Sequence, residues 1–309
     1  MRQTVVALWA AVTGRPDLPV HRGVEVHRLE QSRWPQVVST WSRLTPSGFP
    51  VELTAGPPGT PAHWSAEVAG PEVPEAERLG RVTDLLAAAG TPVAPTLGAA
   101  LRVAQSRGPL QYGAWLGGRE AAGTPARLKL YAELPPGTGA GTLPLPASLR
   151  EPLARLPAAV PRMLGVEPAA DRVELYLRLP ALDPDELAAV LAGIGHAPAA
   201  AALDRGLPDG LRRLYGRRVG LSLADRGDAG AEIALFVTAR TLFPAGPELL
   251  EALAPQVAGL DARFRPAAVT LAPHGPRGEL VAAVGVAPVR ARSAGHLRRA
   301  PVTAGTEQG

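Results

Sequence analysis

The residues Ala126-Arg-Leu-Lys-Leu-Tyr-Ala-Glu-Leu-Pro135 alternate between apolar and polar side chains without a break. Successive side chains of an extended strand point to opposite faces, so this alternation predicts a β-strand with one polar and one apolar face. Arg127, Lys129, Tyr131 and Glu133 would share the polar face. Lys129 stands out further, because every other side chain with a permanent positive charge in the 309-residue chain is an arginine.

The rest of the chain repeats such strands in pairs around turns rich in glycine and proline, which is the pattern of β-hairpins. The pairs are 49–55 with 63–69, 111–117 with 127–134, 164–166 with 172–179, 217–223 with 232–238, and 267–271 with 279–286. Apolar residues at helical spacing separate the pairs. The expected helices are 5–12, 31–44, 74–89, 97–105, 149–156, 183–194, 199–214 and 247–253.

Sequential hairpins favour antiparallel pairing, because a parallel pair needs a crossover between its strands. Ten antiparallel strands can close on themselves and leave no sheet edge. The sequence therefore predicts an α+β fold, a ten-stranded antiparallel β-barrel built from repeated ααββ units. Its helices would lie outside, and the polar strand faces would line the lumen. A pair of α+β sandwiches with polar faces in solvent fits the periodicity equally well.

Composition narrows the classes of function. With 46% hydrophobic residues, the chain can bury a large core. We expect one barrel domain over residues 1–292, followed by a disordered basic and polar tail over residues 293–309. Nucleic-acid binding requires a basic stripe with stacking aromatics, whereas the formal charge here is +4 and aromatics make up 4%. No apolar run is long enough to span a membrane. The lack of cysteine excludes thiolate metal sites and is compatible with the cytoplasm, where we expect the protein.

Four short motifs follow one another in the expected strands: Pro50-Val-Glu-Leu-Thr54, His63-Trp-Ser-Ala-Glu67, Lys129-Leu-Tyr131 and Arg172-Val-Glu-Leu-Tyr176. They resemble, in turn, the motifs Pro-(Ile/Val)-Glu-Phe-Ser, Arg-Tyr-Thr-x-Glu, Lys-x-Tyr and Arg-x-Lys-x-Tyr. In this order they resemble the aromatic prenyltransferases of the ABBA (PT-barrel) fold, in particular the dimethylallyltryptophan synthase-like indole prenyltransferases. The resemblance covers residues 46–288.

The resemblance implies an aromatic prenyltransferase, of the kind found in indole alkaloid and other secondary metabolism. Its partners would be an allylic diphosphate, usually dimethylallyl diphosphate, and an aromatic small molecule or peptide as acceptor. The reaction needs cations for the departing diphosphate, aromatic faces that shield the allyl cation, and a carboxylate that orients the acceptor. Indole-type members require neither Mg²⁺ nor another cofactor, and this chain has no Asp-rich run.

By this resemblance, Glu52 is the catalytic carboxylate that orients the acceptor. Lys129 and Arg172 would bind the diphosphate, and Tyr131 and Tyr176 would shield the allyl cation. The other residues of the expected substrate-binding set are His63, Arg127 and Glu174. Neither the resemblance nor the spacing of the histidines implies a metal site.

Several positions depart from the family pattern. His63 stands where arginine is usual, so that a titratable group replaces a permanent charge. Glu174 stands where lysine is usual, which replaces attraction to phosphate by repulsion. The last expected strand, 279–286, carries no tyrosine, and the fourth hairpin has no Gln-x-Tyr. The arginines that would compensate for the lost charge are Arg127, Arg178, Arg217 and Arg218.

These departures keep other interpretations open. The main alternative is a catalytically degenerate PT-barrel protein that acts as a binding or partner module, and a carrier of hydrophobic ligands is a third. Glu52 and Arg172 would then be solvated strand residues, and the tyrosines would be ordinary strand packing.

Overall fold

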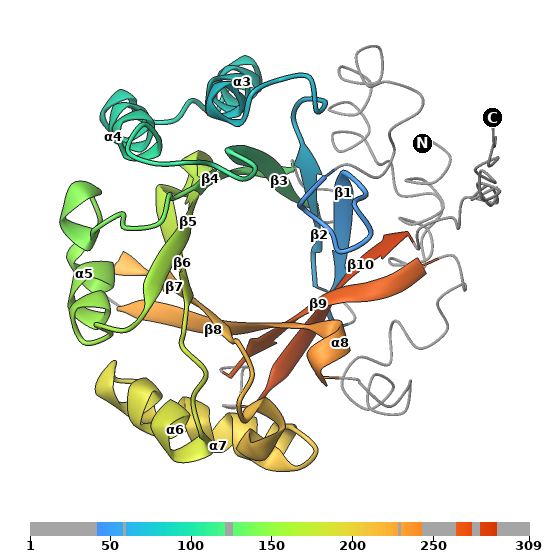
Figure 1. The fold of residues 1–309 in the computed structure, drawn as a ribbon, viewed down its shortest axis with the longest axis vertical. Coiled ribbons are helices and arrows are strands. Elements are labelled where there is room, and N and C mark those ends of the chain that lie inside the picture. The colour runs from blue at the N-terminus through green and yellow to red at the C-terminus, as the bar shows by residue number, and fades with distance from the viewer. Residues whose placement is uncertain are drawn as a thin grey trace, which may run out of the picture.

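The computed structural model describes residues 42–57, 60–120, 126–227, 230–242, 264–273 and 279–288. Ten strands close into a barrel in the order β1-β10-β9-β8-β7-β6-β5-β4-β3-β2. Every neighbouring pair is antiparallel, from β1 with β2 around to β1 with β10 (Figure 1). The predicted ten-stranded antiparallel barrel is therefore confirmed, and the two-sandwich alternative is wrong.

Consecutive hairpins supply the strands. The strands are β1 (Val51–Ala55), β2 (Ala62–Glu67), β3 (Ala114–Glu120), β4 (Arg127–Glu133), β5 (Val160–Glu167), β6 (Arg172–Arg178), β7 (Gly220–Asp225), β8 (Ala231–Thr238), β9 (Phe264–Ala272) and β10 (Val281–Pro288). The α-helices within the described ranges are α3 (Glu75–Ala88), α4 (Pro95–Gln105), α5 (Ala147–Ala154), α6 (Pro184–Gly193), α7 (Ala197–Gly206) and α8 (Ala239–Leu242). Short 3₁₀ turns are η1 (Ala140–Thr142), η2 (Pro168–Ala170) and η3 (Gly210–Leu214).

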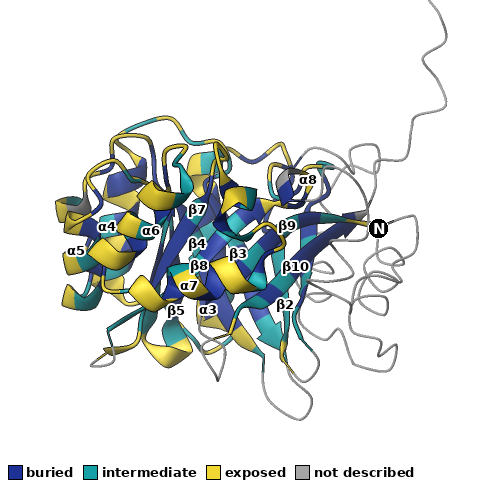
Figure 2. Ribbon diagram, turned by 90° about the horizontal axis from the view of Figure 1, so that it is seen from below, coloured by how far each residue is buried: buried dark blue, intermediate teal, exposed yellow. Residues whose placement is uncertain are grey.

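The apolar strand faces form the core between the barrel wall and the helices outside it (Figure 1). On β4, Leu128 and Leu130 are buried in this core, so the intervening Lys129 points to the opposite, luminal face. Helix α3 packs against β3 and β4, and α5 packs against β7 and β8. Figure 2 shows the strands mostly buried and the outer helix surfaces exposed. The alternation along β4 thus separates a leucine-rich outer face from a polar inner face.

Local sequence signals set the ends of α6. The Asp183 side chain accepts a hydrogen bond from the Glu186 backbone N–H at 2.7 Å, and the Glu186 carboxylate accepts one from the Asp183 N–H at 2.8 Å. This capping box satisfies backbone donors that the first helical turn leaves unpaired. After the helix, Gly195 adopts φ +85°, a backbone conformation that favours glycine.

Several expected boundaries change. The segment 164–166 is part of an eight-residue strand, β5, whose register shift between Pro161 and Met163 obscures the alternation. Strand β3 runs three residues beyond its expected end at Gly117. Strand β7 begins at Gly220, and its expected first residues, Arg217 and Arg218, lie exposed before it.

Some expectations lie outside the described residues. They are the helices at 5–12 and 247–253, most of the helix at 31–44, and the tail at 293–309. Among the helices that are described, none has the length and apolar character needed to cross a membrane.

Candidate active site

Two rows of residues cross the inner face of the barrel. The first row, from β1 to β4, is Glu52, Ser65, Gly117 and Lys129. The second row, closer to the start of β4, is Thr54, His63, Arg119 and Arg127. Residues paired across antiparallel strands lie on the same face of the sheet. The predicted carboxylate Glu52 and the predicted cation Lys129 therefore share the luminal face.

Lys129 is the centre of a buried cluster. Its ammonium group donates hydrogen bonds to the Glu174 carboxylate and to the Tyr176 hydroxyl, the second at 3.0 Å. The same nitrogen lies 4.9 Å from the centroid of the Tyr131 ring and 5.3 Å from that of the Tyr176 ring, which are cation–π distances. The structure thus brings Tyr131, Glu174 and Tyr176 into contact with Lys129.

A glycine on the intervening strand makes room for this cluster. Gly165 on β5 pairs with Tyr131 on one side and with Glu174 on the other. A Cβ atom at Gly165 would lie 2.5 Å from Lys129 Cε and 3.1 Å from Tyr176 Cε2. Since a larger residue would displace the lysine, the Lys129–Glu174 ion pair depends on this glycine.

The Glu174 carboxyl group in this cluster is ionised. Burial alone would raise the pKa of Glu174, but the Lys129 ammonium, the Ser222 hydroxyl and Arg172 outweigh it and lower the pKa to about 2. Burial, followed by the Glu174 carboxylate, raises the pKa of the Tyr176 phenol. At neutral pH, Lys129 therefore faces an ionised carboxylate and a neutral tyrosine.

Glu52 lies half-buried on β1 without a charged partner among the described residues. Burial raises its pKa to about 7, because the lumen solvates the carboxylate poorly. Gly285 on β10 leaves space for the side chain, since a Cβ atom there would lie 2.8 Å from Glu52 Cδ. A carboxyl group with this pKa can accept or release a proton near neutrality.

His63 lies in a region of positive potential. Burial, then Arg119 and Lys129, lower the pKa of the imidazole to about 3, although Glu174 opposes the shift. The imidazole is therefore neutral at physiological pH. Arg119, its neighbour on β3, was missed in the sequence because the expected strand ended at Gly117. Continuing the alternation by two residues would have placed this arginine on the luminal face.

Two predicted diphosphate-site arginines lie near the turn ends of their strands, and each is paired with a glutamate. Arg127, whose side chain is 50% exposed, donates to the buried Glu167 carboxylate. Arg172 Nη2 donates to Glu232 Oε2 at 2.8 Å, and Arg226 Nε lies 3.8 Å from the same oxygen. Sequence reasoning named neither glutamate. The alternating strands contain the arginines, but only the order and register of the strands in the sheet show which carboxylates meet them.

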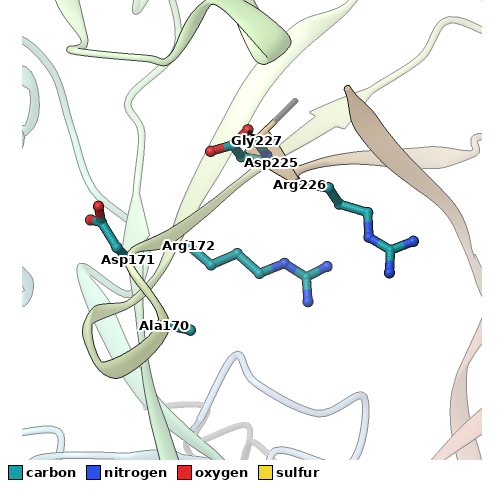
Figure 3. A pocket seen from close by; sticks show the side chains of 6 residues that line it. All are labelled: Ala170, Asp171, Arg172, Asp225, Arg226 and Gly227. Carbon is teal, nitrogen blue, oxygen red and sulfur yellow. Dashed lines mark hydrogen bonds between the residues drawn. The ribbon is translucent and has the colours of Figure 1, made fainter. Parts of the chain in front are cut away.

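Arg172 and Arg226 also line a surface pocket between the β5–β6 and β7–β8 turns (Figure 3), with a cavity volume of about 480 Å³. Its lining is polar and comes from two short segments, 170–172 and 225–227. In Figure 3 the two guanidinium groups extend away from the carboxylates of Asp171 and Asp225. The Asp225 carboxylate instead accepts hydrogen bonds from Ser148 and from the Gly227 N–H.

The opposite end of β4 is held by a carboxylate. Glu133 accepts hydrogen bonds of 2.7–3.0 Å from the backbone N–H groups of Gln111, Tyr112 and Gly113. These bonds fix the segment that carries Tyr112, whose ring stacks on Trp115 with centroids 3.8 Å apart. Trp115 is paired with Tyr131 on β4. This aromatic stack therefore borders the Lys129 cluster on the side of the cluster that is closer to the end of β4.

A further aromatic side chain faces the cluster from the fourth hairpin. Phe236 on β8 lies with its ring centroid 5.4 Å from that of Tyr176, and Tyr176 lies 5.9 Å from Tyr131. The sequence analysis missed Phe236 because it looked for a tyrosine at this hairpin. Within the described part of the chain, no three His, Asp or Glu side chains gather in a way that could hold a metal ion.

No protein-family model and no curated protein sequence matches this chain. A 6-dimethylallyl tryptophan synthase structure matches it with a TM-score of 0.65 at 16% identity, over 94% of this chain and 97% of that one. The 5-dimethylallyl tryptophan synthase of Streptomyces coelicolor matches with a TM-score of 0.61 at 16% identity, over 93% and 94%. The 6-dimethylallyltryptophan synthase of Micromonospora olivasterospora matches with 0.57 at 16%, over 93% and 95%. The chain therefore has the ABBA, or PT-barrel, fold of these aromatic prenyltransferases.

Proposed function

We propose that this protein is an aromatic prenyltransferase of the indole or tryptophan type. It transfers a dimethylallyl or longer prenyl group from an allylic diphosphate to an aromatic small molecule or peptide. One observation carries the proposal: Lys129 lies inside a closed barrel between the rings of Tyr131 and Tyr176, on the same face as Glu52. This arrangement places a cation, two aromatic faces and a carboxylate around one lumen.

Each of these groups matches one need of the reaction. The allylic C–O bond breaks, and its electron pair leaves with the diphosphate. A ring carbon of the acceptor then attacks the allyl cation, and the ring loses a proton. Cations stabilise the departing diphosphate, and aromatic faces stabilise the allyl cation while they exclude water.

We assign these roles to individual residues from where their side chains lie in the lumen. Glu52, whose pKa lies near 7, orients a donor group of the acceptor and takes up charge as the ring is attacked. Tyr131, Tyr176 and Phe236 form the walls around the allyl group. Arg119 and His63 lie one row closer to the start of β4 than Lys129, where the diphosphate would contact them.

The neighbouring structures support the proposed substrates. The Streptomyces coelicolor and Micromonospora olivasterospora proteins were both solved in complex with DMASPP and Trp. We extend this pair of ligands, an allylic donor and an aromatic amino acid, to the present barrel as the first substrates to test.

The test is direct. The purified protein is incubated with dimethylallyl diphosphate, or a longer donor, and with tryptophan, simple indoles or indole-containing peptides. Mass spectrometry should find the acceptor with one added prenyl group, with and without a chelator, because the proposed chemistry needs no Mg²⁺. Glu52→Ala serves as the matched inactive variant. If no acceptor gains mass with any donor chain length, the proposal is wrong.

A second candidate is a degenerate barrel that binds a ligand or partner without catalysis. The ion pair between Lys129 and Glu174 favours it, because the Glu174 carboxylate already balances the positive charge that a diphosphate would need. Calorimetry with a non-hydrolysable donor analogue separates the two. Binding that Lys129→Ala weakens supports the enzyme, whereas absence of binding in the unaltered protein supports the binding module.

A further inference from the structure

Glu174 is the inner-wall residue whose charge fits an anion site least. Its carboxylate is buried and ionised, and it lies on the ammonium group of Lys129. A diphosphate that contacted Lys129 would bring a second negative group to the same place. Like charges in a poorly solvated site repel strongly, so the carboxylate and a phosphate cannot both lie against this lysine at low cost.

Lys129 has little capacity left for another ligand. An ammonium group has three N–H donors. One donates to Glu174 and one to Tyr176, and the rings of Tyr131 and Tyr176 lie over the nitrogen. The tight fit against Gly165 also fixes the end of the side chain. A phosphate oxygen can take the place of the Glu174 carboxylate on the ammonium group only if that carboxylate moves away.

Two arginines of the inner wall show the same matching of charge. Arg127 is paired with Glu167, and Arg172 is paired with Glu232. Arg119 and Arg178 differ, because no carboxylate among the described residues forms an ion pair with either of them. Of these three pairs, the Lys129–Glu174 pair is the most deeply buried, with both side chains at most 10% exposed. Replacing the carboxylate of this pair by a ligand phosphate therefore has the highest free-energy cost of the three.

From these contacts we infer that Glu174 is an internal counter-ion, which competes with the donor diphosphate for Lys129 and thereby sets the donor affinity of this barrel. The inference rests on the proposed function, because it concerns the same donor site. Glu174 thus lowers the affinity for diphosphates, because its carboxylate occupies the position that a phosphate oxygen would take.

The first test uses pyrophosphate, the leaving group, as the probe, with affinity measured by titration calorimetry. Glu174→Gln keeps the size of the side chain and an acceptor for Lys129, but it removes the negative charge. This variant should bind pyrophosphate about tenfold more tightly than the unaltered protein. Glu151→Gln, at an exposed position of α5, changes the net charge equally and should leave the affinity unchanged. Equal or weaker binding by Glu174→Gln overturns the inference.

A second variant covers the case in which Glu174→Gln does not fold. Replacing a buried ion pair by apolar residues of similar volume is often neutral or stabilising, so Lys129→Met/Glu174→Met should fold. Since the pair contributes no net charge, the double variant should bind pyrophosphate within about threefold of the unaltered protein. Any greater loss would show that Lys129 is available to the ligand in the presence of Glu174, and would refute the inference.

The outcomes separate this inference from the proposed function. If the unaltered protein transfers a prenyl group but Glu174→Gln binds pyrophosphate no more tightly, the inference fails and the function stands. If neither the unaltered protein nor Glu174→Gln binds pyrophosphate, the inference fails, and the prenyl-transfer assay decides the function by itself.

Discussion

Gly285 on β10 provides the space that the Glu52 carboxylate occupies on β1, because a Cβ atom at residue 285 would lie 2.8 Å from Glu52 Cδ. The two residues belong to strands at opposite ends of the barrel sequence, which pair only when the barrel closes. The position of the candidate catalytic carboxylate therefore depends on a residue more than two hundred positions away in the chain.

The variant Gly285→Ala should displace this carboxylate. Misplacement of a group that orients the acceptor lowers the rate of the chemical step, so we expect kcat/KM for prenyl transfer to fall about tenfold or more. Gly80→Ala is the control, since nothing lies within 4 Å of a Cβ atom at that helical position. It should keep full activity and stabilise the fold by about 0.5–1 kcal/mol. Equal kcat/KM values for the two variants would contradict the role of Gly285.

The pKa of Glu52 predicts a pH dependence for both activity and stability. If the ionised carboxylate orients the acceptor, kcat/KM should rise as the pH passes through about 7, and Glu52→Gln should have a low, flat profile. Because burial raises the folded-state pKa, the proton is held more tightly in the folded protein. This contribution to stability is complete below the ordinary pKa of 4.5 and is lost as the pH rises through about 7.

Denaturant titrations over the same pH range can isolate this contribution. Burial also raises the pKa of Glu67 to about 7, despite the Ser42 hydroxyl and Arg78, so part of the stability loss belongs to that residue. Glu52→Gln should therefore reduce the loss of stability as the pH rises through about 7 without abolishing it. An unchanged stability profile in Glu52→Gln would show that its carboxyl group titrates normally.

Arg119 should be the arginine with the largest effect on diphosphate affinity. It is paired with His63 in the row next to Lys129 and forms no ion pair with a described carboxylate, so its charge is available to a ligand there. Arg119→Gln should weaken pyrophosphate binding about tenfold or more, by the loss of one charge-assisted contact. Arg102→Gln, exposed on α4, is the matched control and should bind normally. Equal affinities in the two variants would exclude Arg119 from the donor site.

The same variant should change the titration of His63. Arg119 follows burial as a cause of the depressed pKa, so removing its charge should raise the pKa of this imidazole. NMR titration of the His63 ring protons measures the shift. A pKa that stays at about 3 in Arg119→Gln would mean that the two side chains do not interact.

Glu133 should be important for stability. Its carboxylate accepts bonds from three consecutive backbone N–H groups, and the alanine variant would leave these donors without partners. We expect Glu133→Ala to lower the free energy of unfolding by about 3 kcal/mol or more. Glu151→Ala, on the exposed face of α5, should change it by less than about 0.5 kcal/mol. Chemical denaturation compares the two, and a similar small loss in both would rule out the anchoring role.

The alternation around Lys129 predicted both ends of β4 to within one residue. The repetition of hairpins along the chain predicted the closed antiparallel barrel. These features are local, because side-chain direction in a strand follows from position alone. The same rule failed for β5, where the register shift between Pro161 and Met163 interrupts the pattern. The roles assigned by resemblance to Glu52, His63 and Arg172 remain predictions for experiment.

The sequence was enough to determine which side chains of a regular strand share a face, and hence that Lys129, Tyr131 and Arg127 belong together on β4. It could not determine which carboxylate meets which cation. Glu174 is 45 residues from Lys129, and Glu232 is 60 residues from Arg172, so each pairing depends on the order and register of the strands in the sheet. Charge interactions act through space and depend on distance and burial. The tertiary structure therefore decided that Lys129, the single lysine of the chain, lies against a glutamate.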